Sequence, residues 1–289
     1  MNKTVTFCSL AVIMICISSC RIQNPRYFNS PSAQAPVYLE KKGDKRVTAN
    51  IAILPKHENS EFDQLLNSSG ARNSYTVGFD LGTAYAFSDR FMGTLGGFYR
   101  KEKDAFSDND ILQTKSTSKI NYTRKAFDVG LGTLIPFGEQ KIMIFNPIIG
   151  TNFGRSESFL YSTSNTTRDT RIFYFHGNYH KFYLKPNLNF HFNKNFKMSF
   201  IPQVSVMKYH DIEDNYPGDS QEFLGLNRLR KENMWLFEPA TFYQIGLNEQ
   251  EWLKLDLGIA FSFYPHAKDI PEKLRTRNVQ LSIGFSIYP

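Results

Sequence analysis

Apolar and polar residues alternate one for one along most of the chain after residue 46. From Leu253 to Phe263 every second residue is Leu, Ile or Phe, and the residues between them are small or charged. The same rule holds from Val279 to Ile287 and from Tyr75 to Leu81. A period of two residues is typical of β-strands with one apolar face. The pattern therefore predicts an all-β protein, and no segment of similar length has the period of a helix.

The alternation and its interruptions predict about ten strands. We place them at residues 47–54, 74–88, 90–101, 119–137, 140–160, 171–192, 195–209, 233–247, 251–265 and 276–288. Several are longer than the ~5–6 residues usual in globular proteins. Strands of ~9–11 residues or more suit a tilted crossing of a membrane.

The predicted connections are alternately short and long. Short turns fall at 88–90, 138–140, 193–194 and 248–250, and long polar loops fall at 55–73, 102–118, 161–170, 210–232 and 266–275. Transmembrane barrels have short periplasmic turns and long outer loops. We therefore predict an antiparallel up-and-down transmembrane β-barrel of about ten strands over residues 47–289. The first strand then starts on the periplasmic side, and the last strand ends there.

A soluble lipocalin-like barrel or a β-sandwich would show the same alternation, with the apolar face turned inward. Three features favour the membrane barrel. The apolar faces are rich in Phe, Leu and Ile, the opposite faces are rich in Gly, Ala, Ser and Asn, and aromatic residues such as Trp235 and Trp252 lie near strand ends. Aromatic girdles at strand ends are typical of membrane barrels.

The first residues resemble an export signal. A short positive start at Lys3 precedes an apolar stretch, and Ser18-Ser19-Cys20 follows. A Cys after two small residues resembles the bacterial lipobox, so we interpret 1–19 as a lipoprotein signal peptide and Cys20 as the lipidated first residue of the mature chain. An ordinary signal peptide with an accidental Cys is the alternative. The lipid on Cys20 is the only prosthetic group we expect, and no metal is expected.

Residues 20–46 are predicted to be a lipidated N-terminal tether. This segment is rich in Pro, Asn and Ser, and it carries six Lys and Arg residues: Arg21, Arg26, Lys41, Lys42, Lys45 and Arg46. Cations near anionic lipid are each worth about 1 kcal/mol. The tether could therefore lie along headgroups or remain a solvated linker, and the sequence does not decide between the two.

At this point the chain resembles the outer-membrane β-barrel lipoproteins of Bacteroidota, a group without an assigned activity. The resemblance rests on Cys20, on the 36–44 segment before the first strand, and on the strand–turn–strand at 78–91. It implies a barrel in the bacterial outer membrane with a lipid at the N-terminus. Surface-exported lipoproteins of such bacteria usually have acidic residues after the Cys, whereas this chain has Arg21 and Arg26, which favours an anchor in the inner leaflet.

Polar residues on the inward faces are the first candidate site. They are Asp80, Asp128, Lys185, Asn187, Gln203, Glu238, Lys254 and Asp256, with Asn189, Gln244 and Gln280 beside them. A barrel of about ten strands has a narrow lumen that side chains can fill. Opposite charges inside it are expected to pair rather than line a pore. A small solute channel is the alternative.

The six His residues offer little support for catalysis. His210-Asp211 is the most suggestive pair, but neighbours on a strand point in opposite directions, so we expect no direct contact. His176 and His180 could share a face and bind a divalent metal, although a structural role is the simpler interpretation. The sequence has no phosphate-binding loop, dinucleotide fingerprint, metalloprotease helix or G-x-S-x-G turn. We expect a non-enzymatic protein, with an outer-membrane barrel hydrolase as an alternative.

The net charge of +7 points to anionic partners. Nucleic acid does not suit an exported chain, so we expect outer-membrane lipid, and lipopolysaccharide as a second candidate. A sealed barrel transports little. We therefore predict a structural accessory subunit of a larger outer-membrane protein complex for insertion, export or uptake.

Overall fold

The computed structural model describes residues 37–53, 73–109, 115–138, 142–163, 170–218, 226–247, 250–263 and 279–289. The predicted signal peptide, Cys20 and the first part of the tether lie outside the described residues. Among the described residues, no helix is long and apolar enough to cross a membrane.

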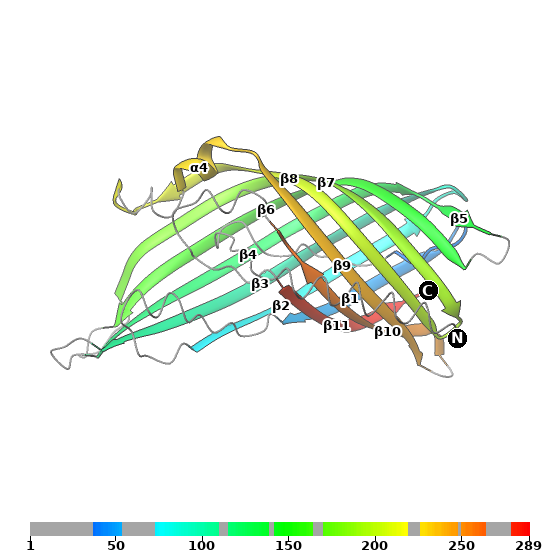
Figure 1. Ribbon diagram of the computed structural model, residues 1–289, viewed down its shortest axis with the longest axis horizontal. Coiled ribbons are helices and arrows are strands. Elements are labelled where there is room, and N and C mark those ends of the chain that lie inside the picture. Colours follow the sequence, from blue (N-terminus) through cyan, green and yellow to red (C-terminus); the bar gives the residue numbers. More distant parts are fainter. Residues whose placement is uncertain are drawn as a thin grey trace.

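The strands form one closed antiparallel barrel (Figure 1). They are β1 (Lys45–Ile53), β2 (Asn73–Ala86), β3 (Phe91–Asn109), β4 (Lys115–Thr133), β5 (Ile135–Phe137), β6 (Met143–Thr163), β7 (Thr170–Asn193), β8 (Phe196–Asp214), β9 (Met234–Leu247), β10 (Gln250–Phe261) and β11 (Val279–Ile287). Strands pair in chain order except that β4 and β5 both pair with β6, and β1 pairs with β11 to close the barrel. Because β5 continues β4 along the same partner, β6, the barrel wall has ten strands. The predicted fold class is confirmed.

The apolar stripe of each strand faces outward. Leu131, Ile149 and Phe182 are 60%, 64% and 66% exposed, whereas the inward Asn187 and Glu238 are both 0% exposed. Apolar side chains exposed on every strand and polar side chains enclosed in the centre are the opposite of a soluble globule. The soluble alternative is therefore wrong. The outward apolar side chains of all the strands together are called the apolar belt below.

The two ends of the barrel differ. The short turns, the start of β1 and the end of β11 lie at one end, called the turn end (Figure 1). At the other end, the loop end, β3, β4, β6, β7 and β8 run for 19 to 24 residues, whereas β1 and β11 have nine residues each. One side of the wall therefore extends well beyond the other.

Two predicted loops are wrong in part. The segment 102–118 is largely strand, because β3 and β4 stay paired from Phe91↔Thr133 to Asn109↔Lys115. The segment 210–232 continues β8 to Asp214 and contains the helix α4 (Leu226–Lys231). Beyond the apolar belt the outward face is polar, so the hydrophobic alternation ends while the backbone pairing continues.

Candidate functional site: the closed lumen

All eight predicted lumen residues are buried inside the barrel. None of them is more than 9% exposed. They come from β2, β4, β7, β8, β9 and β10, so the site joins strands from most of the wall. Their charged groups meet partners from other strands, and these contacts form three clusters.

The first cluster surrounds Glu238 on β9. Lys181 on β7 approaches both carboxylate oxygens at 3.1 Å. On β8, the Gln203 amide donates to Oε2 at 2.7 Å and the Ser205 hydroxyl donates to the same oxygen at 2.6 Å. Four donated hydrogen bonds replace the water that this carboxylate loses on burial. The cluster therefore ties three neighbouring strands together.

The second cluster surrounds Asp256 on β10. Arg46 on β1 contacts Oδ2 through a guanidinium nitrogen at 2.7 Å, and the Gln244 amide donates to Oδ1 at 2.8 Å. Ser286 on β11 also donates to Asp256, and it accepts from Arg46 Nε at 3.0 Å. These contacts cross the seam where the first and last strands meet, so they help to close the barrel.

The third cluster pairs Asp80 on β2 with Arg100 on β3. Gln280 on β11 accepts from Arg100 at 3.1 Å and donates to Asp80 Oδ2 at 3.3 Å. Further toward the loop end, Arg124 lies 3.6 Å from Glu102. These oppositely charged residues therefore pair inside the lumen, between neighbouring strands.

The remaining predicted residues lie outside these three clusters. Lys185 and Asp128 line the same small cavity, and the Lys185 ammonium lies 4.9 Å from the centre of the Tyr183 ring. The Lys254 ammonium donates to the Lys194 carbonyl at 3.4 Å. Asn187 is buried without a hydrogen-bond partner among the described residues.

Sequence analysis named the lumen cations Lys185 and Lys254 but missed three others. Arg46, Arg100 and Lys181 are each at most 4% exposed. Arg46 was assigned to the tether, although it lies two residues before Thr48 and four before Asn50, both of which are buried in the lumen. Extending the alternation of the first strand by one step toward the N-terminus would have found it.

The turn end of the lumen is filled by the chain itself. Val37, Tyr38 and Leu39 are at most 5% exposed, and Val37 and Leu39 belong to one apolar cluster with Ala84, Ala86, Met92, Leu134, Ile148 and Tyr183. The Asn189 amide donates to the Val37 carbonyl at 2.9 Å. The prediction of a solvated or lipid-bound linker is therefore wrong for residues 37–39 and for Arg46, which are buried, whereas Lys41, Lys42 and Lys45 are exposed. The three apolar side chains gain more from burial than from solvent. Residues 37–40 are called the N-terminal plug below.

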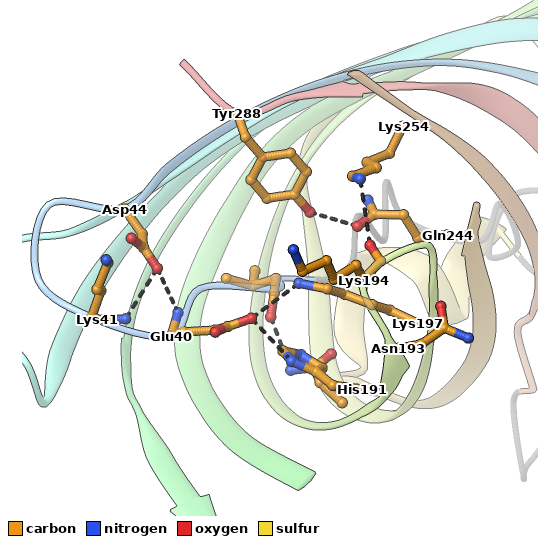
Figure 2. A network of polar contacts seen from close by, with 12 residues as sticks. Glu40, Lys41, Asp44, His191, Asn193, Lys194, Lys197, Gln244, Lys254 and Tyr288 are labelled. Atoms are coloured by element: carbon orange, nitrogen blue, oxygen red, sulfur yellow. Dashed lines mark hydrogen bonds and ion pairs between the residues drawn. The ribbon is translucent and has the colours of Figure 1, made fainter. Parts of the chain in front are cut away.

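Glu40 anchors this plug among cations at the mouth (Figure 2). Its Oε1 lies 3.0 Å from His191 Nδ1 and 3.1 Å from Lys197 Nζ, and Lys194, Lys254 and Tyr288 lie around the same opening. The hydrogen bond with His191 and the Lys197 ammonium lower the pKa of Glu40 to about 2, against partial burial, which raises it. The Asp44 carboxylate accepts from the backbone of Glu40 and Lys41, and Gly43, at φ 89°, completes the turn into β1.

A short helix, α4, packs against the wall at the loop end. Leu226 and Leu229 are 0% exposed and pack against Phe175, Tyr179, Met207, Tyr209, Met234 and Leu236. These six side chains belong to β7, β8 and β9. The extended part of the wall therefore carries an apolar cluster on its inner face, and α4 seals it from water.

The His residues on the outer wall differ from expectation. His210 Nδ1 lies 2.6 Å from Asp211 Oδ2, so the prediction of no contact is wrong. Asp211 has φ 50° and lies beside an irregularity in the β7–β8 register, which breaks the strict alternation of side chains. His176 and His180 do share the outward face, but four residues of strand separate them by about 13 Å, too far to share one metal ion. Among the described residues, no three His, Cys, Asp or Glu side chains could hold a metal ion together.

Comparisons with known proteins bear on the fold alone. No family model and no curated protein matches this chain. The translocator domain of the autotransporter NalP from Neisseria meningitidis has a TM-score of 0.45 at 8% identity, over 85% of this chain and 88% of that one. The COG4313 outer membrane channel from Pseudomonas putida F1 has 0.42 at 5% identity, over 89% and 100%. The outer membrane protease OmpT from Escherichia coli has 0.39 at 6% identity, over 89% and 100%.

Proposed function

We propose that this protein is a non-enzymatic outer-membrane barrel that serves as a structural accessory subunit of a larger envelope assembly for insertion, export or uptake. The observation that carries the proposal is the closed lumen. Charged side chains are paired in its centre, the N-terminal plug occupies the turn end, and α4 packs on the inner face of the extended wall at the loop end. A lumen filled in this way is suited to holding a position in a membrane rather than to passing solutes.

The outer part of the wall supports a docking role. The long strands β3, β4, β6, β7 and β8 project past the apolar belt as a continuous paired sheet. A rigid sheet that extends into the aqueous phase offers a partner a preformed surface. We further propose that Cys20 carries a covalent lipid, that the turn end faces the periplasm, and that the chain belongs with the Bacteroidota barrel lipoproteins that it resembles.

The catalytic alternative has less support from the geometry. On the outer wall, His210, the partner of Asp211, lines a groove with Lys125 and Arg155, and no Ser, Thr or Cys is among the described residues that line it. A nucleophilic hydrolase needs such a side chain within hydrogen-bond reach of the His. The channel alternative would require the pairs in the lumen and the plug to move aside.

Two measurements on the full-length protein test the proposal. Chemical crosslinking in native membranes, followed by purification in mild detergent, should yield one discrete species much larger than the 33.4 kDa chain. The purified chain alone in planar bilayers should give no stepwise conductance, whereas a porin inserted in the same way should. Migration as an unaccompanied monomer after crosslinking would contradict the accessory role, and reproducible conductance steps would favour the channel.

A further inference from the structure

The outward face of the barrel becomes cationic immediately beyond the apolar belt, on the loop side. Lys125 on β4 and Arg155 on β6 are directly opposite each other, and so are His180 on β7 and Lys208 on β8. Two residues nearer the turn end, the same outward faces carry Phe127 and Phe153 as one pair and Phe182 and Val206 as another. The boundary between apolar and cationic side chains therefore runs across four adjacent strands.

The Lys125–Arg155 pair places two like charges side by side. Like charges directly opposite each other on neighbouring strands are destabilising. The Arg155 Nε lies 2.6 Å from the Glu157 carboxylate, but Lys125 forms no ion pair within the described part of the chain. An anion placed between the two side chains would relieve this repulsion.

A groove in the outer wall lies at this position. Lys125, Arg155, His180 and His210 line it together with the apolar rings of Phe127 and Phe153. The two Phe side chains are 48% and 46% exposed, and the His180 ring meets the edge of Phe153 at 4.8 Å between centroids. The nearby Asp211 carboxylate is engaged by His210 and by the Asn178 amide. The groove therefore joins an apolar side facing the belt to a cationic side facing water.

We propose that this groove binds the phosphate headgroup of a lipid in the leaflet at the loop end. Arg and Lys donate charge-assisted hydrogen bonds to phosphate oxygens, and Arg does so with two parallel donors. The acyl chains of the same lipid would lie along Phe127 and Phe153, in the hydrocarbon layer. The phosphate could belong to a phospholipid or to a phosphorylated glycolipid, which share this chemistry. This site requires only the membrane barrel and is independent of the accessory role.

Native mass spectrometry of the detergent-purified, full-length protein can test the site. The probes are phosphatidylglycerol, bisphosphorylated lipid A, and diacylglycerol with matched acyl chains as the lipid without phosphate. We expect the double variant K125Q/R155Q to bind the preferred phosphorylated lipid roughly 30-fold more weakly than wild type, which corresponds to about 1 kcal/mol for each cation. The control K41Q/K42Q makes the same charge change at exposed turn-end positions and should bind like wild type.

The single variant K125Q guards against a loss of fold. Because Lys125 is exposed and has no ion pair among the described residues, its replacement should leave the barrel intact and weaken binding roughly fivefold. Whichever phosphorylated lipid binds wild type more tightly identifies the source of the phosphate. Equal affinities of wild type and both groove variants would overturn the proposal, and so would binding of diacylglycerol as tight as that of the phosphorylated lipids.

Discussion

At the scale of single residues, the lumen depends on carboxylates that are buried and hydrogen-bonded from several strands. Glu238 is 0% exposed and is contacted by Lys181, Gln203 and Ser205. Removing one partner of a buried ion pair leaves the other charge in a medium that solvates it poorly. The buried charge that is left without a partner, rather than the strength of the pair, then determines the cost.

We expect the substitution Glu238→Gln to lower the free energy of unfolding by about 3–5 kcal/mol, because the Lys181 ammonium loses its carboxylate. Urea unfolding in detergent, followed by the fluorescence of Trp235 and Trp252, measures this change. Glu213→Gln is the matched control, since Glu213 is exposed on β8 and its replacement should leave the midpoint unchanged. If both variants unfold at the same urea concentration, the buried pair does not have this role.

Glu40 makes the stability of the N-terminal plug depend on pH. Its pKa is lowered to about 2 by His191 and Lys197. A lowered carboxylate pKa stabilises the folded state above the unfolded value of about 4.3, and this contribution disappears as pH falls toward the folded value. Wild type should therefore be more stable than Glu40→Gln above about pH 4.5, and the difference should shrink toward pH 2. Unfolding midpoints at pH 7, 4 and 2.5 measure it, and a difference that stays constant would contradict the contact.

At the scale of elements, the seam between β1 and β11 closes the barrel and leaves no room for a side chain at Gly284. A Cβ added at Gly284 would lie 2.1 Å from the Ala49 carbonyl oxygen and 2.5 Å from Asn50 Cα. Both are backbone atoms, so the strands would have to move apart. A side chain at this position would therefore act on barrel closure.

Gly284→Ala should cost about 1–3 kcal/mol through overpacking, and it should reduce the fraction of chain that reaches the folded, heat-modifiable form on gels. Gly93→Ala on β3 is the control, because a Cβ there would meet no atom within 4 Å. Equal yields and equal stability of the two variants would show that the seam tolerates a wider spacing than the structure has.

The sequence predicted strands well where the membrane requires outward apolar residues to alternate with inward polar ones, and less well elsewhere. Within the apolar belt, residues such as Leu255 and Ile283 must alternate with inward polar residues, so strand positions follow from the pattern. In the sequence of β3 beyond Glu102 the strict alternation of apolar and polar residues ends, and that part of the strand was missed. Val37 to Leu39 were assigned to a linker, because three consecutive apolar residues do not show the two-residue period of a strand. The His210–Asp211 contact depends on a register irregularity that local sequence does not show.

At the scale of the whole molecule, two features could hold the protein in a membrane, and they are separable. One is the apolar belt, whose outward side chains are exposed on strands all around the barrel, for example Ile51, Leu95, Leu131, Leu184 and Phe285. The other is the predicted lipid on Cys20, which lies outside the described residues. A spanning barrel needs no lipid to stay inserted, because its apolar surface has no other favourable environment.

Replacing Cys20 with Ala should therefore abolish incorporation of labelled palmitate while leaving the barrel in the membrane pellet after extraction at high pH. Cys8→Ala and Cys16→Ala are matched controls that should retain the label, since both residues belong to the predicted signal peptide. Release of the Cys20→Ala chain as soluble material without detergent would contradict a barrel held by its belt. Retention of the label in that variant would contradict Cys20 as the lipidated residue. It would not contradict the membrane barrel, because the belt and the lipid act through different parts of the chain.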